Sequence, residues 1–194
     1  KHVPWIHNLK NTDMVMAVDD QSCMNLVRLF NEPAGRSYLV EQGVPEELVD
    51  KLDLLGISSI ANVLSCIKFA KWYELGEEDV VLTVLTDSME LYGSRLRELH
   101  EAHGQYDETD AAVDYHRDIL GTGIQYVEEL GYWDAKRIHN LKYFTWIEQQ
   151  GKELEELNAQ WYDDGYWDEI HDKVDEMDEL IKAFNEKVGL LDES

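Results

Sequence analysis

The chain has 194 residues, of which 41 are acidic and 17 are basic, and its formal net charge at pH 7 is −24. Such an excess of negative charge repels phosphate groups, so the composition argues against nucleic acids and anionic membrane surfaces as partners. Hydrophobic residues make up 44% of the chain, enough for a core, but no apolar run approaches the roughly 20 residues that span a bilayer.

A strand pattern followed by a helix pattern opens the chain. The run MVMAV, residues 14–18, predicts a buried strand. It ends at Asp19 and Asp20, and either side chain would cap the helix that follows. The positions of that helix expected to face the core are Cys23, Leu26, Val27, Leu29 and Phe30.

Two interruptions and a short helix come next. Pro33 and Gly35 break the first helix. The stretch VPEELVDKL, residues 44–52, predicts a short helix with Pro45 in its first turn. A second short strand would then end at Leu54–Leu55.

The second strand leads into a turn and a longer helix. Gly56 permits a tight turn of the backbone, and Ser58 or Ser59 would cap a helix that runs to about Glu74. The apolar face of that helix carries Ile60, Val63, Leu64, Ile67 and Ala70. The repeat of three and four residues along this face is typical of an amphipathic helix.

The stretch GEEDVVLTVLTDS, residues 76–88, predicts a turn and a third strand that ends at Asp87 and Ser88. Small polar residues at such a strand end are well placed to contact a ligand. The alternative is that Asp87 or Ser88 only caps the helix from Met89. Because strand and helix patterns alternate and the strands are nearly all apolar, we expect an α/β fold with a mostly parallel sheet.

After about Ser94 the sequence shows helix patterns only. We therefore divide the chain into an α/β part, residues 1–95, and an acidic helical extension, residues 96–194. Apolar residues of the last helix pattern recur at three- and four-residue steps, at Ile170, Val174, Met177, Ile181 and Phe184. The acidic residues between them are typical of a solvated helix face.

One basic and aromatic stretch, RIHNLKYFTWIEQQ (residues 137–150), interrupts the acidic half. It predicts a helix whose outer side carries Arg137, His139 and Lys142 next to acidic neighbours. The core side would carry Ile138, Leu141, Phe144 and Ile147. The alternative is an oligomer contact or a lid over an active site. The tryptophans expected to pack helices together are Trp133, Trp146, Trp161 and Trp167.

Two blocks of the first half resemble the fold-type II pyridoxal-phosphate enzymes, which include cysteine synthase, cystathionine β-synthase and threonine synthase. The first block, Gly56-Ile57-Ser58-Ser59, is similar to the family's glycine-isoleucine-serine-serine-glycine turn. The second, Asp87-Ser88 followed by Glu90 and Tyr92, is similar to its proline-aspartate-serine and glycine-glutamate-arginine-tyrosine pattern. The resemblance covers about residues 1–95. The departures from the pattern are Ile60, Thr86, Met89 and Leu91.

The resemblance implies the C-terminal portion of a three-layer large domain, followed by the helical extension. It implies pyridoxal 5′-phosphate as cofactor, with Ser88 facing the pyridine nitrogen, Asp87 beside it and Gly56 letting the backbone pass close to the ring. A neutral serine does not hold the ring nitrogen protonated, which favours β-elimination and β-replacement. The implied activity is that of a lyase or transferase acting on an amino acid, by β- or γ-elimination or replacement.

The family's Schiff-base lysine and its glycine-rich phosphate loop have no counterpart in this sequence. We therefore expect that the chain alone does not catalyse and that an N-terminal portion of the same protein supplies these groups. The first residue is not Met, which suggests a fragment or a processed product. The resemblance also implies a homodimer. The alternative is a non-catalytic helical interaction or regulatory subunit that retains part of the enzyme fold.

The other residues considered for a functional site are two histidines and the two cysteines. His100 and His103 are three residues apart, a spacing that can hold a metal, but no third ligand follows at a matching spacing, so we assign no metal. The two cysteines, Cys23 and Cys66, lie in apolar helix patterns, which indicates buried free thiols. Free thiols are typical of a reducing compartment, and no signal peptide opens the chain, so we expect a cytoplasmic protein.

Overall fold

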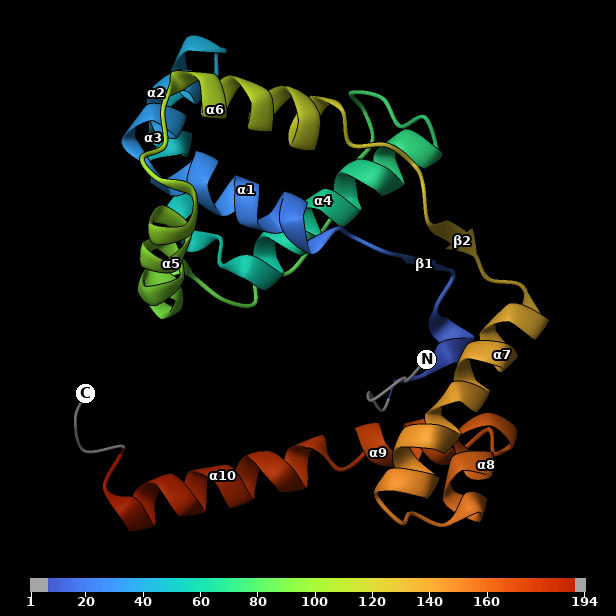
Figure 1. Ribbon diagram of the computed structural model, residues 1–194. Coiled ribbons are helices and arrows are strands. Elements are labelled where there is room, and N and C mark those ends of the chain that lie inside the picture. The colour runs from blue at the N-terminus through green and yellow to red at the C-terminus, as the bar shows by residue number, and fades with distance from the viewer. Residues whose placement is uncertain (1–6, 191–194) are drawn as a thin grey trace. The chain divides into compact units, whose positions relative to one another are not determined.

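The computed structural model describes residues 7–190, and the chain forms two compact units (Figure 1). The central unit comprises residues 16–128, and the terminal unit comprises residues 1–15 together with residues 129–194. The chain passes between them through two short strands, β1 (Met14–Met16) and β2 (Val127–Glu129), which pair with each other. The division expected from the sequence, between residues 95 and 96, lies inside helix α5 (Gly93–His103) of the central unit.

The expected α/β fold with a three-layer parallel sheet is wrong. The structure is 67% helical, and residues 7–190 contain only two strands, which are short and antiparallel. Of the three predicted strands, residues 14–18 give only β1, and its partner β2 lies in a stretch that reads as helix. Leu54 belongs to a 3-10 turn, η2 (Leu52–Leu54), and residues 79–88 pair with no strand in the described chain.

The central unit is built around helix α1 (Asp20–Asn31), which contacts the four longer helices of the unit. Those four are α2 (Pro33–Glu41), α4 (Ile57–Trp72), α5 and α6 (Glu108–Asp114). The short elements of the unit are α3 (Glu46–Val49), η2, the 3-10 turn η3 (Met89–Tyr92) and the π-helical turn η4 (Tyr115–Leu120).

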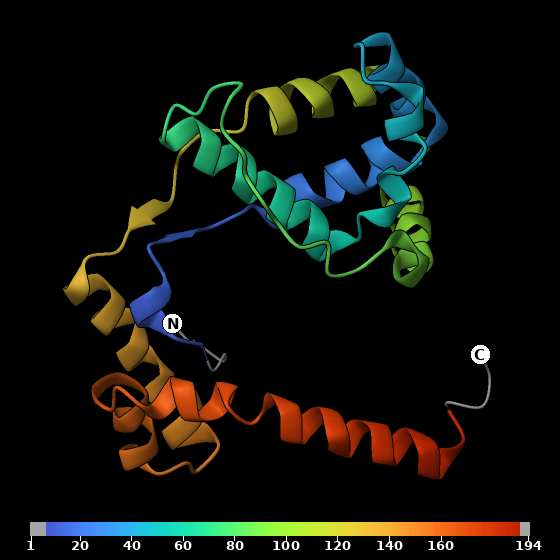
Figure 2. The ribbon, with the colours of Figure 1, turned by 180° about the vertical axis from the view of Figure 1, so that it is seen from behind.

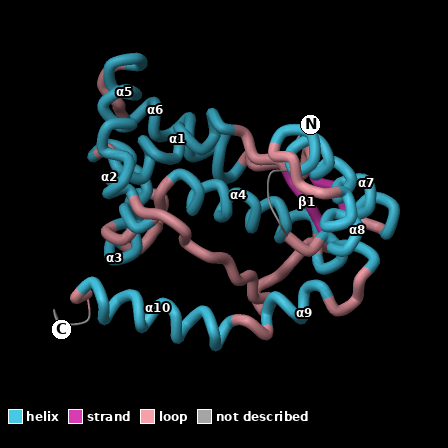
Figure 3. The backbone as a smooth tube through the Cα atoms, turned by 90° about the horizontal axis from the view of Figure 1, so that it is seen from below, coloured by secondary structure: helices cyan, strands magenta, loops and turns pink. Residues whose placement is uncertain are grey.

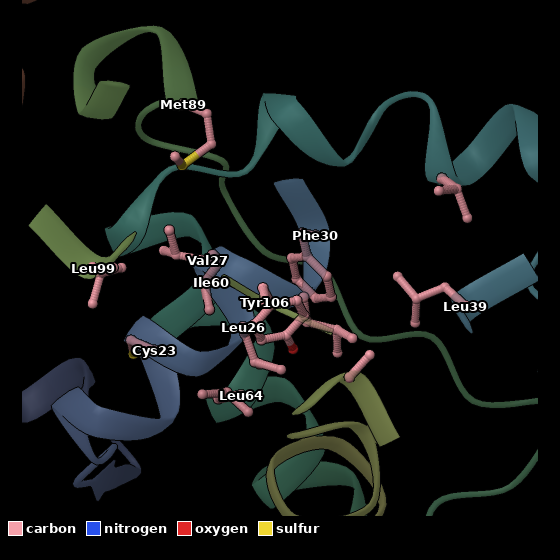
Figure 4. Close-up of a cluster of buried hydrophobic side chains, with 13 residues drawn as sticks. Cys23, Leu26, Val27, Phe30, Leu39, Ile60, Leu64, Met89, Leu99 and Tyr106 are labelled. Carbon is pink, nitrogen blue, oxygen red and sulfur yellow. The ribbon is translucent and has the colours of Figure 1, made fainter. Parts of the chain in front are cut away.

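Helix α1 forms as the sequence predicts. The Asp19 carboxylate accepts a hydrogen bond from the Gln21 backbone N–H at 2.8 Å, which caps the helix. All five predicted core positions are buried, and Figure 4 shows several of them meeting Ile60 and Leu64 of α4. Helix α2 crosses α1 so closely that a Cβ atom on Gly35 would lie 2.2 Å from the Leu29 carbonyl oxygen. Only glycine fits at that crossing.

The third predicted strand, residues 79–88, runs beside α4 as a loop (Figure 2). Its side chains alternate as in a strand: Val80 is 91% exposed and Leu82 92%, whereas Val81 is 38% exposed. Within the described chain, no backbone N–H from Val80 to Thr86 donates a hydrogen bond. The sequence pattern is that of a strand, but the chain supplies no neighbour for it.

The helices of the terminal unit are the 3-10 turn η1 (Leu9–Asn11), α7 (Tyr132–Tyr143), the π-helical turn η5 (Phe144–Gln149), α8 (Leu154–Tyr162), α9 (Tyr166–His171) and α10 (Val174–Val188). Leu9, Ala135 and Trp161 form their small apolar core. From residue 7 to residue 190, none of the helices has the length and apolarity that crossing a membrane requires.

The predicted orientation of the 137–150 helix is wrong for His139, Lys142 and Phe144, whereas Arg137 is exposed as predicted. His139 is 2% exposed and Lys142 is fully buried, whereas Phe144 is 43% exposed. The Lys142 ammonium donates hydrogen bonds to the His7 carbonyl at 2.6 Å and to the Gln160 Oε1 at 3.2 Å. His139 Nε2 lies 3.0 Å from the Leu157 carbonyl, to which it donates as the neutral tautomer. Two polar groups therefore join α7 to its neighbours from the inside.

Candidate functional site

The structure brings together the three residues singled out by the sequence, Gly56, Asp87 and Ser88. The Gly56 backbone N–H donates a hydrogen bond to the Asp87 carbonyl at 3.0 Å. A Cβ atom on Gly56 would lie 2.5 Å from the Asp87 Cγ atom. The close approach of the two segments therefore requires glycine at this position.

Asp87 caps helix α4 from a distant part of the chain. Its Oδ2 atom accepts from the Ser58 backbone N–H at 3.1 Å, and its Oδ1 atom accepts from the Ser59 backbone N–H at 2.9 Å. The Ser59 hydroxyl donates to Oδ1 at 2.8 Å, and the Tyr92 hydroxyl to Oδ2 at 2.7 Å. The predicted caps, Ser58 and Ser59, are thus the donors, and Asp87 caps the preceding helix rather than the following one.

These hydrogen bonds change the acidity of Asp87. Partial burial alone would raise the pKa of the carboxyl group, but the bonds from Tyr92, Ser59 and Ser58 outweigh burial and lower the pKa from 3.8 to about 2. Asp87 is therefore ionised at any pH near neutrality. Its negative charge also lies at the positive end of the α4 dipole.

We expect Asp87→Asn to lower the free energy of unfolding by about 1–2 kcal/mol at pH 7, because an amide cannot accept all of these bonds. The folded pKa lies below the unfolded one, so the wild-type advantage exists above about pH 4 and disappears as the pH falls toward 2. Urea unfolding of both proteins at pH 7, 4 and 2.5 measures this, with the exposed Glu77→Gln as control. An equal difference at all three pH values would contradict the assignment.

Ser88 differs from Gly56 and Asp87 because its side chain takes no part in the hydrogen bonds that join the two segments. The side chain is half-buried, and the hydroxyl makes no hydrogen bond to any residue between 7 and 190. Its backbone is held on one side by Asp87 and on the other by Met89, which is only 6% exposed. The backbone on both sides of Ser88 is thus anchored, while its hydroxyl has no partner in the described part of the chain.

A second polar site, which the sequence did not reveal, lies on α6 and η4. Asp118, 5% exposed, accepts hydrogen bonds from the Ser22 hydroxyl at 2.9 Å and the Asn25 amide at 2.8 Å. The Arg117 guanidinium donates to Asp118 at 2.8 Å and to Asp114 at 2.6 Å. Burial raises the pKa of Asp114, whereas at Asp118 the hydrogen bonds from Arg117, Asn25 and Ser22 outweigh burial and lower the pKa.

Three members of this network, Ser22, Arg117 and Asp118, line a cavity of about 470 Å³ in the central unit. The cavity also contains Lys68, whose ammonium donates to the Gln125 carbonyl at 2.7 Å. At its edge, Tyr126 holds a left-handed backbone conformation with φ of 58°. The volume suits a small molecule, but both cations in the lining already have protein partners.

The only trace of this network in the sequence is the spacing of Asp114, Arg117 and Asp118. Residues three and four apart share one face of a helix. This spacing does not show whether that face points outward or toward α1, so the sequence alone does not predict the network. The donors Ser22 and Asn25 lie more than 90 residues away in the chain.

The histidines considered for a metal do not converge. His100 and His103 are exposed on α5, and His116 Nε2 lies 3.3 Å from the Tyr38 hydroxyl. Throughout the described part of the chain, no three His, Cys, Asp or Glu side chains are grouped so that they could hold a metal ion. Cys23 and Cys66 are free thiols, and burial raises the pKa of Cys23 to about 11.

No family model, curated protein or solved structure matches this chain.

Proposed function

We propose that this chain supplies the ring-nitrogen contact of a pyridoxal-phosphate site in an enzyme that acts on an amino acid by β- or γ-elimination or replacement. The observation that supports the proposal is the unused hydroxyl of Ser88, held beside the turn at Gly56. The cofactor, when bound, serves as an electron sink for the substrate.

The residues at the junction fit this role. A serine hydroxyl can donate a hydrogen bond to a pyridine nitrogen without supplying a charge. Asp87 cannot replace it, because its carboxylate already accepts from Ser58, Ser59 and Tyr92. Asp87 is therefore a positioning residue, which fixes the backbone from which Ser88 projects.

The lysine and the phosphate-binding groups would come from residues outside this chain. Lys68 and Lys71 are not suited, because their ammonium groups are bound to carbonyl oxygens of residues 120–125. The backbone N–H groups from Val80 to Thr86, which donate to no group within residues 7–190, offer an edge to which a strand of another segment can bind. An N-terminal portion of the same protein, a homodimeric state and a cytoplasmic location belong to this proposal.

The test uses the full-length product that contains this chain. We expect Ser88→Ala to weaken binding of pyridoxal phosphate by roughly tenfold, the worth of one hydrogen bond. The unfolding midpoint should not change, because the hydroxyl has no partner among the residues that the structure describes. Fluorescence titration with the cofactor measures the affinity, and Ser58→Ala, an exposed serine at the start of α4, is the matched control.

Two results would end this proposal. The first is a full-length product that binds no pyridoxal phosphate. The second is a Ser88→Ala variant with the affinity of wild type. If the product binds the cofactor but loses affinity equally on Ser58→Ala, the effect comes from the start of α4 and not from the Ser88 hydroxyl.

A non-catalytic interaction subunit is the second candidate, and one observation favours it. Helix α10 has no buried residue and exposes its whole apolar stripe, as a surface for a partner would. A native product without a lysine-bearing segment upstream, and without cofactor, would favour this candidate over the enzyme.

A further inference from the structure

Helix α10 is amphipathic but unpartnered within its own unit (Figure 3). Its apolar residues lie on one face, at three- and four-residue steps, and each is exposed over about half of its surface or more. They are Val174, Met177, Leu180, Ile181, Phe184 and Val188. An apolar stripe of this size normally covers another surface.

The same helix is acidic. Asp175, Glu176, Asp178 and Glu179 crowd its first half, and Lys182 and Lys187 are its only cations. Any surface that covers the stripe therefore needs positive charge around an apolar floor. Most of this protein cannot offer it, because the chain as a whole carries a net charge of −24.

A groove between α7 and α8 has the required properties. Its volume is about 760 Å³, and its lining includes the exposed aromatic rings of Trp133 and Phe144 together with Leu154. Lys136 and Arg137 also line it, and among residues 7–190 no aspartate or glutamate does. The Lys136 ammonium lies over the rings of Trp161 and Tyr162, at 4.6 and 4.3 Å from their centroids. The groove is thus apolar and basic in an acidic protein.

The connection between α9 and α10 keeps α10 away from the groove of its own chain. Only Asp172 and Lys173 separate the two helices. The Asp172 N–H donates to the Asp168 carbonyl at 2.9 Å, and the Met177 N–H donates to the Lys173 carbonyl at 2.9 Å. Folding α10 back onto the groove of its own chain would break these two hydrogen bonds. The α10 helix of a second copy can reach the groove without breaking them.

We propose that α10 of one copy binds in the α7–α8 groove of a second copy, and that the two copies exchange this contact symmetrically. The apolar stripe covers Trp133, Phe144 and Leu154, and the acidic flank faces Lys136. Laying an amphipathic helix into an apolar groove is a common mode of recognition. Twofold exchange doubles the buried area, as in closed homodimers.

The test measures the mass of the full chain by analytical ultracentrifugation over a range of concentrations. We expect a dimer with a dissociation constant of roughly micromolar order. Ile181→Asp and Phe184→Asp should each weaken it at least a hundredfold. Ala183→Asp, which puts the same charge on the opposite side of α10, is the matched control and should leave the dimer intact. All three positions are exposed, so none should affect folding.

The groove is tested by exchanging charges. Lys136→Glu should weaken the dimer about tenfold, and Asp178→Lys in the same chain should restore part of that loss. A dimer that survives Ile181→Asp would overturn the proposal. So would a dimer that Ile181→Asp breaks but Lys136→Glu does not, which would place α10 against a second α10. A chain that stays monomeric at all concentrations would overturn the proposal as well. In that case, a change of tryptophan fluorescence in Phe184→Asp would indicate that α10 binds the groove of its own chain.

Discussion

Replacing Asp118 by alanine should lower the free energy of unfolding of the central unit by about 2–4 kcal/mol. The variant leaves two partly buried donors of α1, the Ser22 hydroxyl and the Asn25 amide, without their acceptor. Arg117 keeps only Asp114 as its partner. The cost is that of buried polar groups left without hydrogen bonds, not that of a surface ion pair.

Hydrogen exchange is the suitable measurement, because it locates the loss. Peptides from α1 and from residues 115–120 should exchange faster in the variant, whereas those from α7 and α8 should not change. Glu101→Ala, an exposed acid on α5, serves as the control and should have no effect. Equal protection in the Asp118 variant and in wild type would show that the network contributes nothing to stability.

The terminal unit should lose stability in acid and gain it in base, because of two buried groups. Burial, together with the nearby Lys142 ammonium, lowers the pKa of His139 from 6.5 to about 4. Burial lowers the pKa of Lys142 from 10.5 to about 8. For each residue, the unfolded chain binds more protons than the folded one at pH values between the folded and the unfolded pKa. The free energy of unfolding therefore rises with pH across that interval.

For His139 the window is pH 4 to 6.5, and for Lys142 it is pH 8 to 10.5. Each should change the free energy of unfolding by on the order of 2–3 kcal/mol across its window. Urea unfolding at pH 4, 6.5, 8 and 10, followed by hydrogen exchange in α7, measures both.

Lys142→Met separates the two contributions. It should abolish the rise above pH 8 while keeping most of the loss below pH 6.5, and Lys152→Met, at an exposed lysine, should change neither. A wild-type profile that is flat from pH 8 to 10, or a Lys142→Met profile identical to wild type, would refute the account of Lys142.

The features that were predicted best from the sequence are those that depend only on residues within one helix. The cap at Asp19 and the five core positions of α1 follow from residues within one stretch of twelve, and all were confirmed. The short helix after Pro45 was predicted for the same reason, although it is shorter than its pattern. Spacing along one helix needs no knowledge of the rest of the chain.

Strands were predicted badly because a strand is defined by its neighbour. Residues 79–88 have the composition and the alternation of a strand, yet no segment of the described chain pairs with them. Conversely, β2 has only three residues, Val127–Glu129, and it exists because it pairs with β1. No single-segment pattern contains that information.

The inner face of α7 could not be predicted for a related reason. Hydropathy places Lys142 and His139 outside, but carbonyl and amide groups from His7, Leu157 and Gln160 accept their hydrogen bonds in the interior. Those partners come from distant parts of the sequence. The same holds for the candidate site. The resemblance to a known family grouped Gly56 with Asp87 and Ser88, but the sequence did not predict that Asp87 caps α4.

The unpaired stretch from Val80 to Leu85 has a cost that the acidity of the chain offsets. Six residues of high β propensity, without charge, proline or glycine, are the kind of segment that stacks into fibrils when its edge is accessible. Glu77, Glu78 and Asp79 immediately precede it, and Asp87 follows. These charges act as gatekeepers against stacking, and the net charge of −24 opposes non-specific stacking of this segment between copies. Concentrated salt, by screening that repulsion, would remove part of the protection.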